Sequence, residues 1–298
     1  MDTSPTWLDG GLATELQRAG LPVRAPWWST IALNGEQRRT VLRAVHERSI
    51  AAGADVITAN TFRCNYRALR GIGLQDAGLA WMVHAAVGVA QSARDSAGRP
   101  GVTVAGSLAP VEDCYRPDLV PADDELRAEH RWLATELKRS GVDLVLIETM
   151  NTAREARIAL EQVQAVGCRA WVSFVVAEGT GLLSGESLTA AAAAAERDGA
   201  QAVLVNCAPL ADTEVALREL AATCTGPFGV YPGLEDRRGV PAWQHADRSL
   251  PAAAGPDEFA DRVAAWRART GISIIGGCCG ATPAHLAAAR GRLVPEMR

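Results

Sequence analysis

The chain has 298 residues, of which 48% are hydrophobic and 21% charged, proportions typical of a soluble globular protein that buries a large core. Its formal net charge of −4, with no basic stripe, excludes nucleic acid as an expected partner. Seven cysteines, an odd number that includes an adjacent pair, do not resemble the framework of a disulfide-rich secreted domain. We therefore expect thiols that are kept reduced, as in the cytoplasm.

The first residues, Met1-Asp2-Thr3-Ser4-Pro5, lack the charged and apolar parts of a signal peptide. No uninterrupted apolar stretch reaches the roughly 18 residues of a membrane-spanning helix, so no membrane partner is expected. Lys138 is the only lysine, and it falls in a predicted exposed helix. Schiff-base chemistry and a phosphate-binding P-loop are therefore excluded.

Eight short runs rich in apolar or β-branched residues are predicted to be strands. In chain order they are Trp7–Asp9, Val56–Ala59, Val102–Gly106, Leu144–Ile147, Trp171–Val175, Ala202–Asn206, Phe228–Tyr231 and Ile272–Gly276. Amphipathic helices are predicted between them, over stretches such as Glu36–Ala52, Asp123–Ser140, Ala153–Val166, Ser187–Asp198, Asp212–Cys224 and Asp257–Thr270. This alternation is typical of βαβ units, and we expect the eight units to close into a single α/β domain over residues 1–298, a (β/α)₈ TIM barrel.

In such a barrel the active site lies at the carboxyl ends of the strands, so polar side chains that follow a strand are candidate site residues. This criterion selects Asp9, Asn60, Thr61, Ser107, Glu148, Asn206, Cys207, Cys278 and Cys279. Trp27 and Trp28, in the first βα loop, are candidates for lining the pocket. The five histidines are interpreted as structural residues.

The sharpest local signal is Ile275-Gly276-Gly277-Cys278-Cys279-Gly280. Adjacent cysteines on a regular strand point to opposite faces, but flanking glycines permit an irregular backbone that turns both sulfurs to one side. Together with Cys207 they offer three thiolates, the number of protein ligands that leaves a catalytic zinc one open position. The remaining cysteines are interpreted as small buried side chains: Cys64, Cys114, Cys168 and Cys224.

Two alternatives to a catalytic zinc remain open at this point. Cys278 and Cys279 could form a redox-sensing pair joined by a vicinal disulfide, although disulfides are uncommon in the cytosol. A purely structural zinc in a non-catalytic barrel is the other alternative. Structural sites use four protein ligands, and the sequence offers no obvious fourth.

Several motifs are distributed along nearly the whole chain. They are Asp9-Gly10-Gly11-Leu12-Ala13-Thr14-Glu15-Leu16, Val45-His46 with Ala52-Gly53-Ala54-Asp55-Val56-Ile57, Ala59-Asn60-Thr61-Phe62, Glu148-Thr149-Met150 with Glu155-Ala156, Val205-Asn206-Cys207, and Gly276-Gly277-Cys278-Cys279-Gly280-Ala281-Thr282-Pro283-Ala284-His285. Together these motifs resemble those of the homocysteine S-methyltransferase family.

The resemblance implies a zinc ion bound by Cys207, Cys278 and Cys279, with the homocysteine sulfur in the fourth position. Asp9 and Glu148 would hold the α-ammonium group of homocysteine. Asn206 would orient the neighbouring cysteine loop, and Thr61 and Ser107 are candidates for binding the substrate carboxylate. The implied reaction transfers a methyl group from a sulfonium donor to homocysteine and gives methionine.

The donor is inferred by elimination. The chain ends soon after the last predicted helix, so we expect neither folate nor cobalamin domains, nor the long C-terminal extension of the betaine-dependent branch. S-methylmethionine is therefore the expected donor, with S-adenosylmethionine as a second possibility. Tyr231-Pro232-Gly233 departs from the Tyr-Pro-Asn usual in the family, and if Gly233 replaces an Asn that contacts the donor, Gly233→Asn should raise activity with S-methylmethionine. Another donor, another thiol or selenol acceptor, and the oligomeric state stay open.

Overall fold

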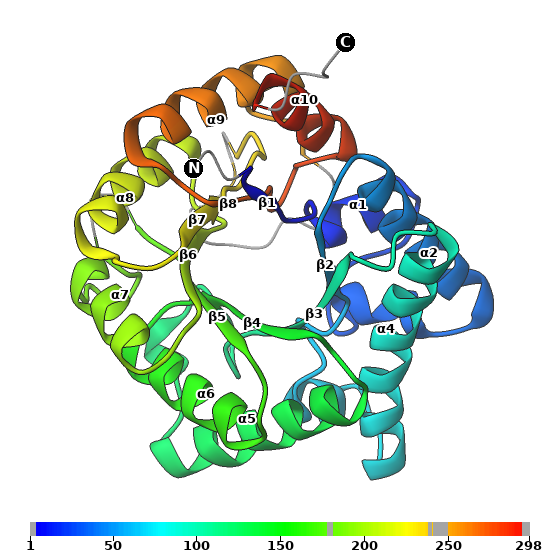
Figure 1. Cartoon of the computed structure of the whole chain (residues 1–298). Coiled ribbons are helices and arrows are strands. Elements are labelled where there is room, and N and C mark those ends of the chain that lie inside the picture. Colours follow the sequence, from blue (N-terminus) through cyan, green and yellow to red (C-terminus); the bar gives the residue numbers. More distant parts are fainter. Residues whose placement is uncertain (1–3, 178–180, 238–239, 241–249, 294–298) are drawn as a thin grey trace.

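The computed structural model describes the chain except for residues 1–3, 178–180, 238–239, 241–249 and 294–298. A ring of parallel strands lies at the centre and is surrounded by helices (Figure 1). The strands are β1 (Thr6–Trp7), β2 (Val56–Ala59), β3 (Thr103–Leu108), β4 (Leu144–Met150), β5 (Ala170–Phe174), β6 (Ala202–Asn206), β7 (Phe228–Tyr231) and β8 (Ile274–Ile275).

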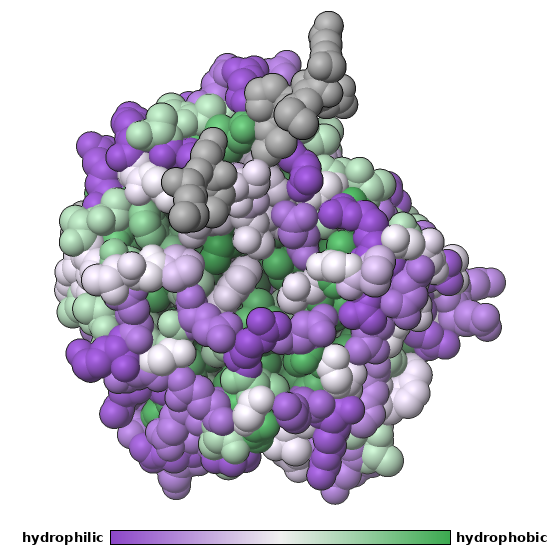
Figure 2. Space-filling view, viewed as in Figure 1, coloured by the Kyte–Doolittle hydropathy of each residue, from purple (hydrophilic) through white to green (hydrophobic). Residues whose placement is uncertain are grey.

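The helices cover the outside of the strand ring (Figure 1), and on the face shown in Figure 2 many of the residues around the rim are hydrophilic. None of those in the described ranges is long and apolar enough to cross a membrane. They are α1 (Leu12–Arg18), α2 (Glu36–Ala51), α3 (Tyr66–Gly71), α4 (Asp76–Ser96), α5 (Asp123–Arg139), α6 (Ala153–Ala165), α7 (Leu188–Arg197), α8 (Leu210–Thr223), α9 (Pro256–Thr270) and α10 (Pro283–Leu293), with 3-10 helices η1 (Trp28–Leu33) and η2 (Pro117–Leu119).

The strands follow one another around the ring in chain order. Each strand from β2 to β8 pairs in parallel with the next, and β8 pairs with β1. A parallel bridge between Leu8 and Val56 joins β1 to β2, and the Asp9 N–H donates to the Val56 carbonyl at 3.0 Å. The predicted (β/α)₈ barrel is thereby confirmed.

The first strand and the last, β1 and β8, which pair with each other, are shorter than predicted. The sequence predicted strands over Trp7–Asp9 and Ile272–Gly276, but β1 and β8 each keep only two residues in regular pairing. After β1 and after β8 the chain turns early into the loops that carry Asp9 and the two adjacent cysteines. Regular strand geometry is therefore lost where polar side chains gather.

Alternation along the strands determines which side chains reach the barrel mouth. In β4, Leu144 and Leu146 belong to a buried cluster inside the ring, while Val145 and Ile147 pack in the layer between strands and helices. Because residues two apart share a face of a strand, Glu148 continues the inward row of Leu144 and Leu146. A polar side chain is thus placed directly above an apolar barrel core.

Candidate active site

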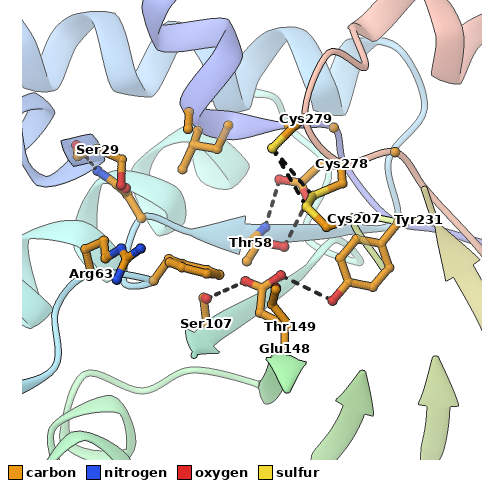
Figure 3. Close-up of a pocket in the computed structure, with 18 of the residues that line it drawn as sticks. Ser29, Thr58, Arg63, Ser107, Glu148, Thr149, Cys207, Tyr231, Cys278 and Cys279 are labelled. Carbon is orange, nitrogen blue, oxygen red and sulfur yellow. Dashed lines mark hydrogen bonds between the residues drawn. A yellow bond between two sulfur atoms is a disulfide. The ribbon is translucent and has the colours of Figure 1, made fainter. Parts of the chain in front are cut away.

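A cavity of about 170 Å³ opens where the carboxyl ends of the strands meet. Its wall combines polar groups with aromatic side chains, and Trp28 is among them, as the sequence suggested. Residues contributed by several different strands face one another across it (Figure 3). The polar groups with possible roles in chemistry are Asp9, Ser107, Glu148, Tyr231, Cys207, Cys278 and Cys279.

The three cysteines selected from the sequence lie together in the cavity wall. Their sulfur atoms all lie within 4.8 Å of one another. The Cys279 sulfur is 3.8 Å from that of Cys207 and 4.0 Å from that of Cys278. The structure joins Cys207 to Cys278 in a disulfide and leaves Cys279 as a thiol, so the vicinal disulfide considered for Cys278 and Cys279 is wrong.

The backbone holds these cysteines in an irregular conformation. Cys207 directly follows β6 and has a φ of +55°, a left-handed conformation that is uncommon for a residue with a side chain. Its N–H donates to the Tyr231 carbonyl at 3.1 Å, and the Cys278 N–H donates to the Pro232 carbonyl at 2.8 Å. Both loops are therefore anchored on the end of β7 and the residue that follows it.

Gly280 allows the cysteine loop to pack against that same segment. It has a φ of +85°, and a Cβ atom there would lie 2.7 Å from the Glu235 nitrogen. The neighbouring Cys279 carbonyl accepts a hydrogen bond from the Leu234 N–H at 2.7 Å. This close approach explains the need for glycine beside the cysteine pair.

Asp9 is almost fully buried at the end of the first strand. Its two carboxylate oxygens accept hydrogen bonds from the N–H and the hydroxyl of Thr58, both at 2.9 Å. Burial raises the pKa of Asp9 to about 7, an effect that the Thr58 hydrogen bonds oppose and the charge of Glu148 reinforces. A cation bound beside Asp9 would restore its ionised form.

Glu148 is held by two hydroxyl groups (Figure 3). The Ser107 hydroxyl donates to one carboxylate oxygen, and the Tyr231 hydroxyl donates to the other at 3.2 Å. Burial raises the pKa of Glu148 to about 7 although both hydrogen bonds lower it. The cavity therefore holds two carboxyl groups whose ionised forms both lack a fully compensating charge, which suits a cationic ligand group.

A bulge in β4 sets the position of Glu148. The β4–β5 register shifts between Ile147 and Met150, and Thr149 has a φ of +60°. Asn206 holds this strained residue, because its side-chain oxygen accepts from the Thr149 N–H at 3.0 Å and its amide donates to the Thr149 hydroxyl at 2.7 Å. A bulge re-aims the side chains beside it, so Asn206 supports the backbone that presents Glu148.

The other polar candidates have different surroundings from those predicted. Thr61 is fully buried outside the cavity wall, and its hydroxyl donates to the Ser107 carbonyl at 2.8 Å. Ser107 faces the cavity but directs its hydroxyl to Glu148. In this structure the Thr61 hydroxyl thus joins two strand ends and the Ser107 hydroxyl holds Glu148, and binding of the substrate carboxylate by these two residues stays a prediction. Asn206 is also fully buried behind the wall.

Sequence reasoning missed Thr58, Arg63 and Tyr231. Tyr231 ends β7 on the inward face, so the strand-end criterion applied to the last strand residue would have found it. Thr58 lies within β2 and Arg63 in the loop after it, where no local pattern marks them. Cys114, interpreted as a buried side chain, is buried but also lines the cavity.

Comparison with known proteins identifies the family of the chain. The family model described as homocysteine S-methyltransferase matches residues 6–293. Homocysteine S-methyltransferase 4 of Zea mays is 29% identical over 94% of this chain and 87% of its own length. A selenocysteine Se-methyltransferase of Brassica oleracea is 27% identical over 96% of this chain and 88% of its own.

A solved structure extends the agreement to three dimensions. The metallated form of the homocysteine methyltransferase MmuM from Escherichia coli matches 98% of this chain and 97% of its own, at 27% identity and a TM-score of 0.84. The family model and this structural match both span almost the full barrel. The chain therefore belongs to the homocysteine S-methyltransferase family.

Proposed function

We propose that this protein is a zinc-dependent methyltransferase that moves a methyl group from a sulfonium donor to the thiolate of L-homocysteine and so forms methionine. The observation that carries the proposal is the meeting of three cysteine sulfurs with two buried carboxyl groups in one cavity. The three cysteines suit a metal ion that binds a thiol, and the two carboxyl groups suit an α-ammonium group. Homocysteine carries both groups on one short chain.

The cysteine sulfurs fit a zinc ion. Two sulfurs that each lie 2.3 Å from a tetrahedral zinc are about 3.8 Å apart. The sulfur of Cys279 lies 3.8 and 4.0 Å from those of its two partners, which supports binding of one ion by all three. Cys207 and Cys278 must be reduced for this, so we place the protein in a reducing compartment such as the cytoplasm.

Asp9 and Glu148 suit the α-ammonium group. Each has a pKa of about 7, and a bound ammonium would favour the ionised form of both. Thr58 fixes Asp9, while Ser107 and Tyr231 fix Glu148, so the two carboxylates are oriented before the substrate arrives. The cost of ordering these groups is thereby met in folding and not in binding.

The reaction itself needs alignment more than proton transfer. Zinc, when bound, would deprotonate the homocysteine thiol and keep its sulfur at the cysteines. A free thiol is already a few per cent ionised at pH 7, so ionisation accounts for about 2 kcal/mol of the barrier. Positioning of the two reactants by the cavity residues can contribute roughly 7–11 kcal/mol.

The bonds and charges balance without a further reactant. The homocysteine sulfur forms a bond to the methyl carbon while the bond from that carbon to the donor sulfur breaks. Its electron pair stays on the donor sulfur, which changes from a cationic sulfonium to a neutral thioether. The anionic site residues attract the cationic donor, and S-methylmethionine is our first choice, with S-adenosylmethionine second.

A methyl-transfer assay tests this proposal. Reduced, zinc-loaded protein is incubated with homocysteine and each sulfonium donor, and methionine is measured. Cys279→Ser should abolish both tight zinc binding and activity while the barrel stays folded, whereas Cys168→Ser should leave both unchanged. Wild-type zinc content in Cys279→Ser would refute the metal site, and lack of methionine with either donor would refute the donor.

A selenol acceptor is the second candidate. The Brassica oleracea relative, named a selenocysteine Se-methyltransferase, is similar over nearly the whole chain. A selenolate offers the same kind of soft ligand to zinc as a thiolate. Competition between homocysteine and selenocysteine in the same assay measures which acceptor has the higher kcat/KM.

A further inference from the structure

Arg63 is the one basic side chain among the described residues that line the cavity. Figure 3 shows it on the opposite side of the cavity from the three cysteines. It also lines a neighbouring groove together with Trp28 and Asp113. Arg63 therefore lies at the junction between the cavity and this groove, on the side away from the proposed metal site.

Buried hydrogen bonds fix the loop that carries Arg63. At one end, the Asn60 amide donates to the Ser29 carbonyl at 2.8 Å. At the other end, the Asn65 amide donates to the Val111 carbonyl at 3.0 Å. Because both anchoring side chains are buried, the loop backbone holds Arg63 in a defined place at the cavity wall.

Two aromatic rings hold the guanidinium itself. Its central carbon lies 5.7 Å from the ring centre of Trp28 and 5.4 Å from that of Phe62. These are distances at which a cation is attracted to an aromatic ring. A guanidinium is a planar group with five N–H donors, which matches a carboxylate better than any other side chain does.

Arg63 lies in the part of the cavity where the methyl donor is expected to bind. In a direct transfer, the donor sulfur must lie beyond the methyl carbon as seen from the homocysteine sulfur. With homocysteine held at the cysteines and at Asp9 and Glu148, the donor occupies the part of the cavity away from the cysteines. S-methylmethionine brings an α-carboxylate into that part.

We propose that Arg63 binds the α-carboxylate of the methyl donor and so makes the enzyme selective for donors that are amino acids. This inference rests on the proposed function, because it takes homocysteine as the acceptor and a sulfonium as the donor. Arg63 would act in recognition alone, since it lies across the cavity from the reacting sulfur. Its loss should change donor affinity and leave homocysteine affinity unaltered.

Steady-state kinetics with two donors test the inference. One donor is S-methylmethionine, and the other is the (3-aminopropyl)dimethylsulfonium ion, which keeps the sulfonium and ammonium groups and lacks the carboxylate. For Arg63→Gln, kcat/KM with S-methylmethionine should fall about 10- to 100-fold, mainly through KM. Its kcat/KM with the carboxylate-free donor and its KM for homocysteine should equal those of the wild type.

Two further variants separate recognition from folding. Arg63→Lys keeps the charge without the planar fork and should fall between the wild type and Arg63→Gln. Arg70→Gln removes a charge from the adjacent helix α3, outside the cavity wall, and should behave as wild type. An equal loss with both donors, or a raised KM for homocysteine, would overturn the role of Arg63. An inactive wild type would instead overturn the proposed donor and this inference with it.

Discussion

At the scale of single residues, Glu148 is the side chain that we propose recognises the ammonium group of an amino acid. Its two oxygens are held by Ser107 and Tyr231, and its pKa is raised to about 7 by burial. These features fix the carboxyl group where water has limited access, and a bound ammonium group would favour its ionised form. The carboxylate can therefore contribute a strong, directed bond to an ammonium group.

Glu148→Gln tests this role. Glutamine keeps the shape and one accepting oxygen but removes the charge, so homocysteine should bind more weakly by about 1.5–3 kcal/mol. Zinc content should not change, since Glu148 is not among the grouped metal-ligating residues. Calorimetric titration of the zinc-loaded protein measures the affinity, with Glu47→Gln, a half-buried position on helix α2 outside the cavity wall, as control. An unaltered affinity would remove Glu148 from the substrate site.

The strand-end criterion selected Glu148, its partner Ser107 and the three cysteines, which all line the cavity, but not Thr58 and Tyr231. The strand-end criterion works because polar groups above an apolar barrel core have few other reasons to be there. Thr58 reaches Asp9 from the neighbouring strand β2, whereas Tyr231 reaches Glu148 across the barrel from β7, so both contacts depend on how the strands are arranged in the closed barrel. The pairing of Cys207 with Cys278 likewise depends on loop conformation, which no spacing rule determines.

At the scale of elements, the bulged end of β4 depends on Asn206. Its side chain makes two hydrogen bonds to Thr149 and accepts a third from the Ser173 hydroxyl at 2.7 Å. Asn206→Ala should lower the free energy of unfolding by about 2–4 kcal/mol, because buried partners lose their bonds. Urea unfolding measures this loss.

The matched control is Ser173→Ala, which removes one of these bonds and should cost about 1 kcal/mol. Asn206→Ala should also weaken homocysteine binding, because the bulge presents Glu148. One hydrogen bond contributes about 1 kcal/mol. If the free energy of unfolding of Asn206→Ala fell by less than this, the account of the bulge would be contradicted.

In the loop after β7, the surroundings of Gly233 differ from the donor contact that the sequence suggested. A Cβ atom there would point at the Cys207 carbonyl oxygen, 3.1 Å away, and Gly233 is not among the residues lining the cavity. The residue thus lets two loops pack closely and does not face the donor. An asparagine side chain at this position would press on the backbone of a metal-binding loop.

Gly233→Asn should therefore fail to raise activity with S-methylmethionine and should weaken zinc binding, with an overpacking cost of about 1–3 kcal/mol. Competition with a chelator measures the zinc affinity. Gly101→Asn is the control, because a Cβ atom there meets no atom within 4 Å. A gain in activity for Gly233→Asn would restore the original interpretation of a lost donor contact.

At the scale of the whole molecule, the alternation of strands and helices was sufficient to predict the barrel. Strand ends were less predictable, because β1 and β8 are shortened and β4 extends through a bulge to Met150. Both departures arise from tertiary packing at the site and not from local preference. The site is therefore where the pattern in the sequence describes the backbone least well.

His46 makes the stability of the whole molecule depend on pH. It lies in α2, fully buried, and neither ring nitrogen has a hydrogen-bond partner within the described part of the chain. Burial lowers its pKa from 6.5 to about 4. Above pH 6.5 both folded and unfolded states are neutral, and below it the unfolded state binds the proton first, so stability falls from pH 6.5 to 4.

The expected loss by pH 4 is about 3 kcal/mol from this residue. His46→Leu should remove that part of the pH dependence. Denaturant unfolding of both proteins at pH 7 and pH 4.5 gives the difference. The same decline in stability in His46→Leu as in the wild type would contradict this assignment.

The central claim is that Cys207, Cys278 and Cys279 bind one zinc ion whose fourth position receives the homocysteine sulfur. Zinc K-edge X-ray absorption of the reduced, zinc-loaded protein tests it most directly. Without substrate the ion should have three sulfur neighbours at about 2.3 Å and one oxygen or nitrogen neighbour. With homocysteine it should have four sulfur neighbours, and a coordination shell unchanged by homocysteine would contradict the claim.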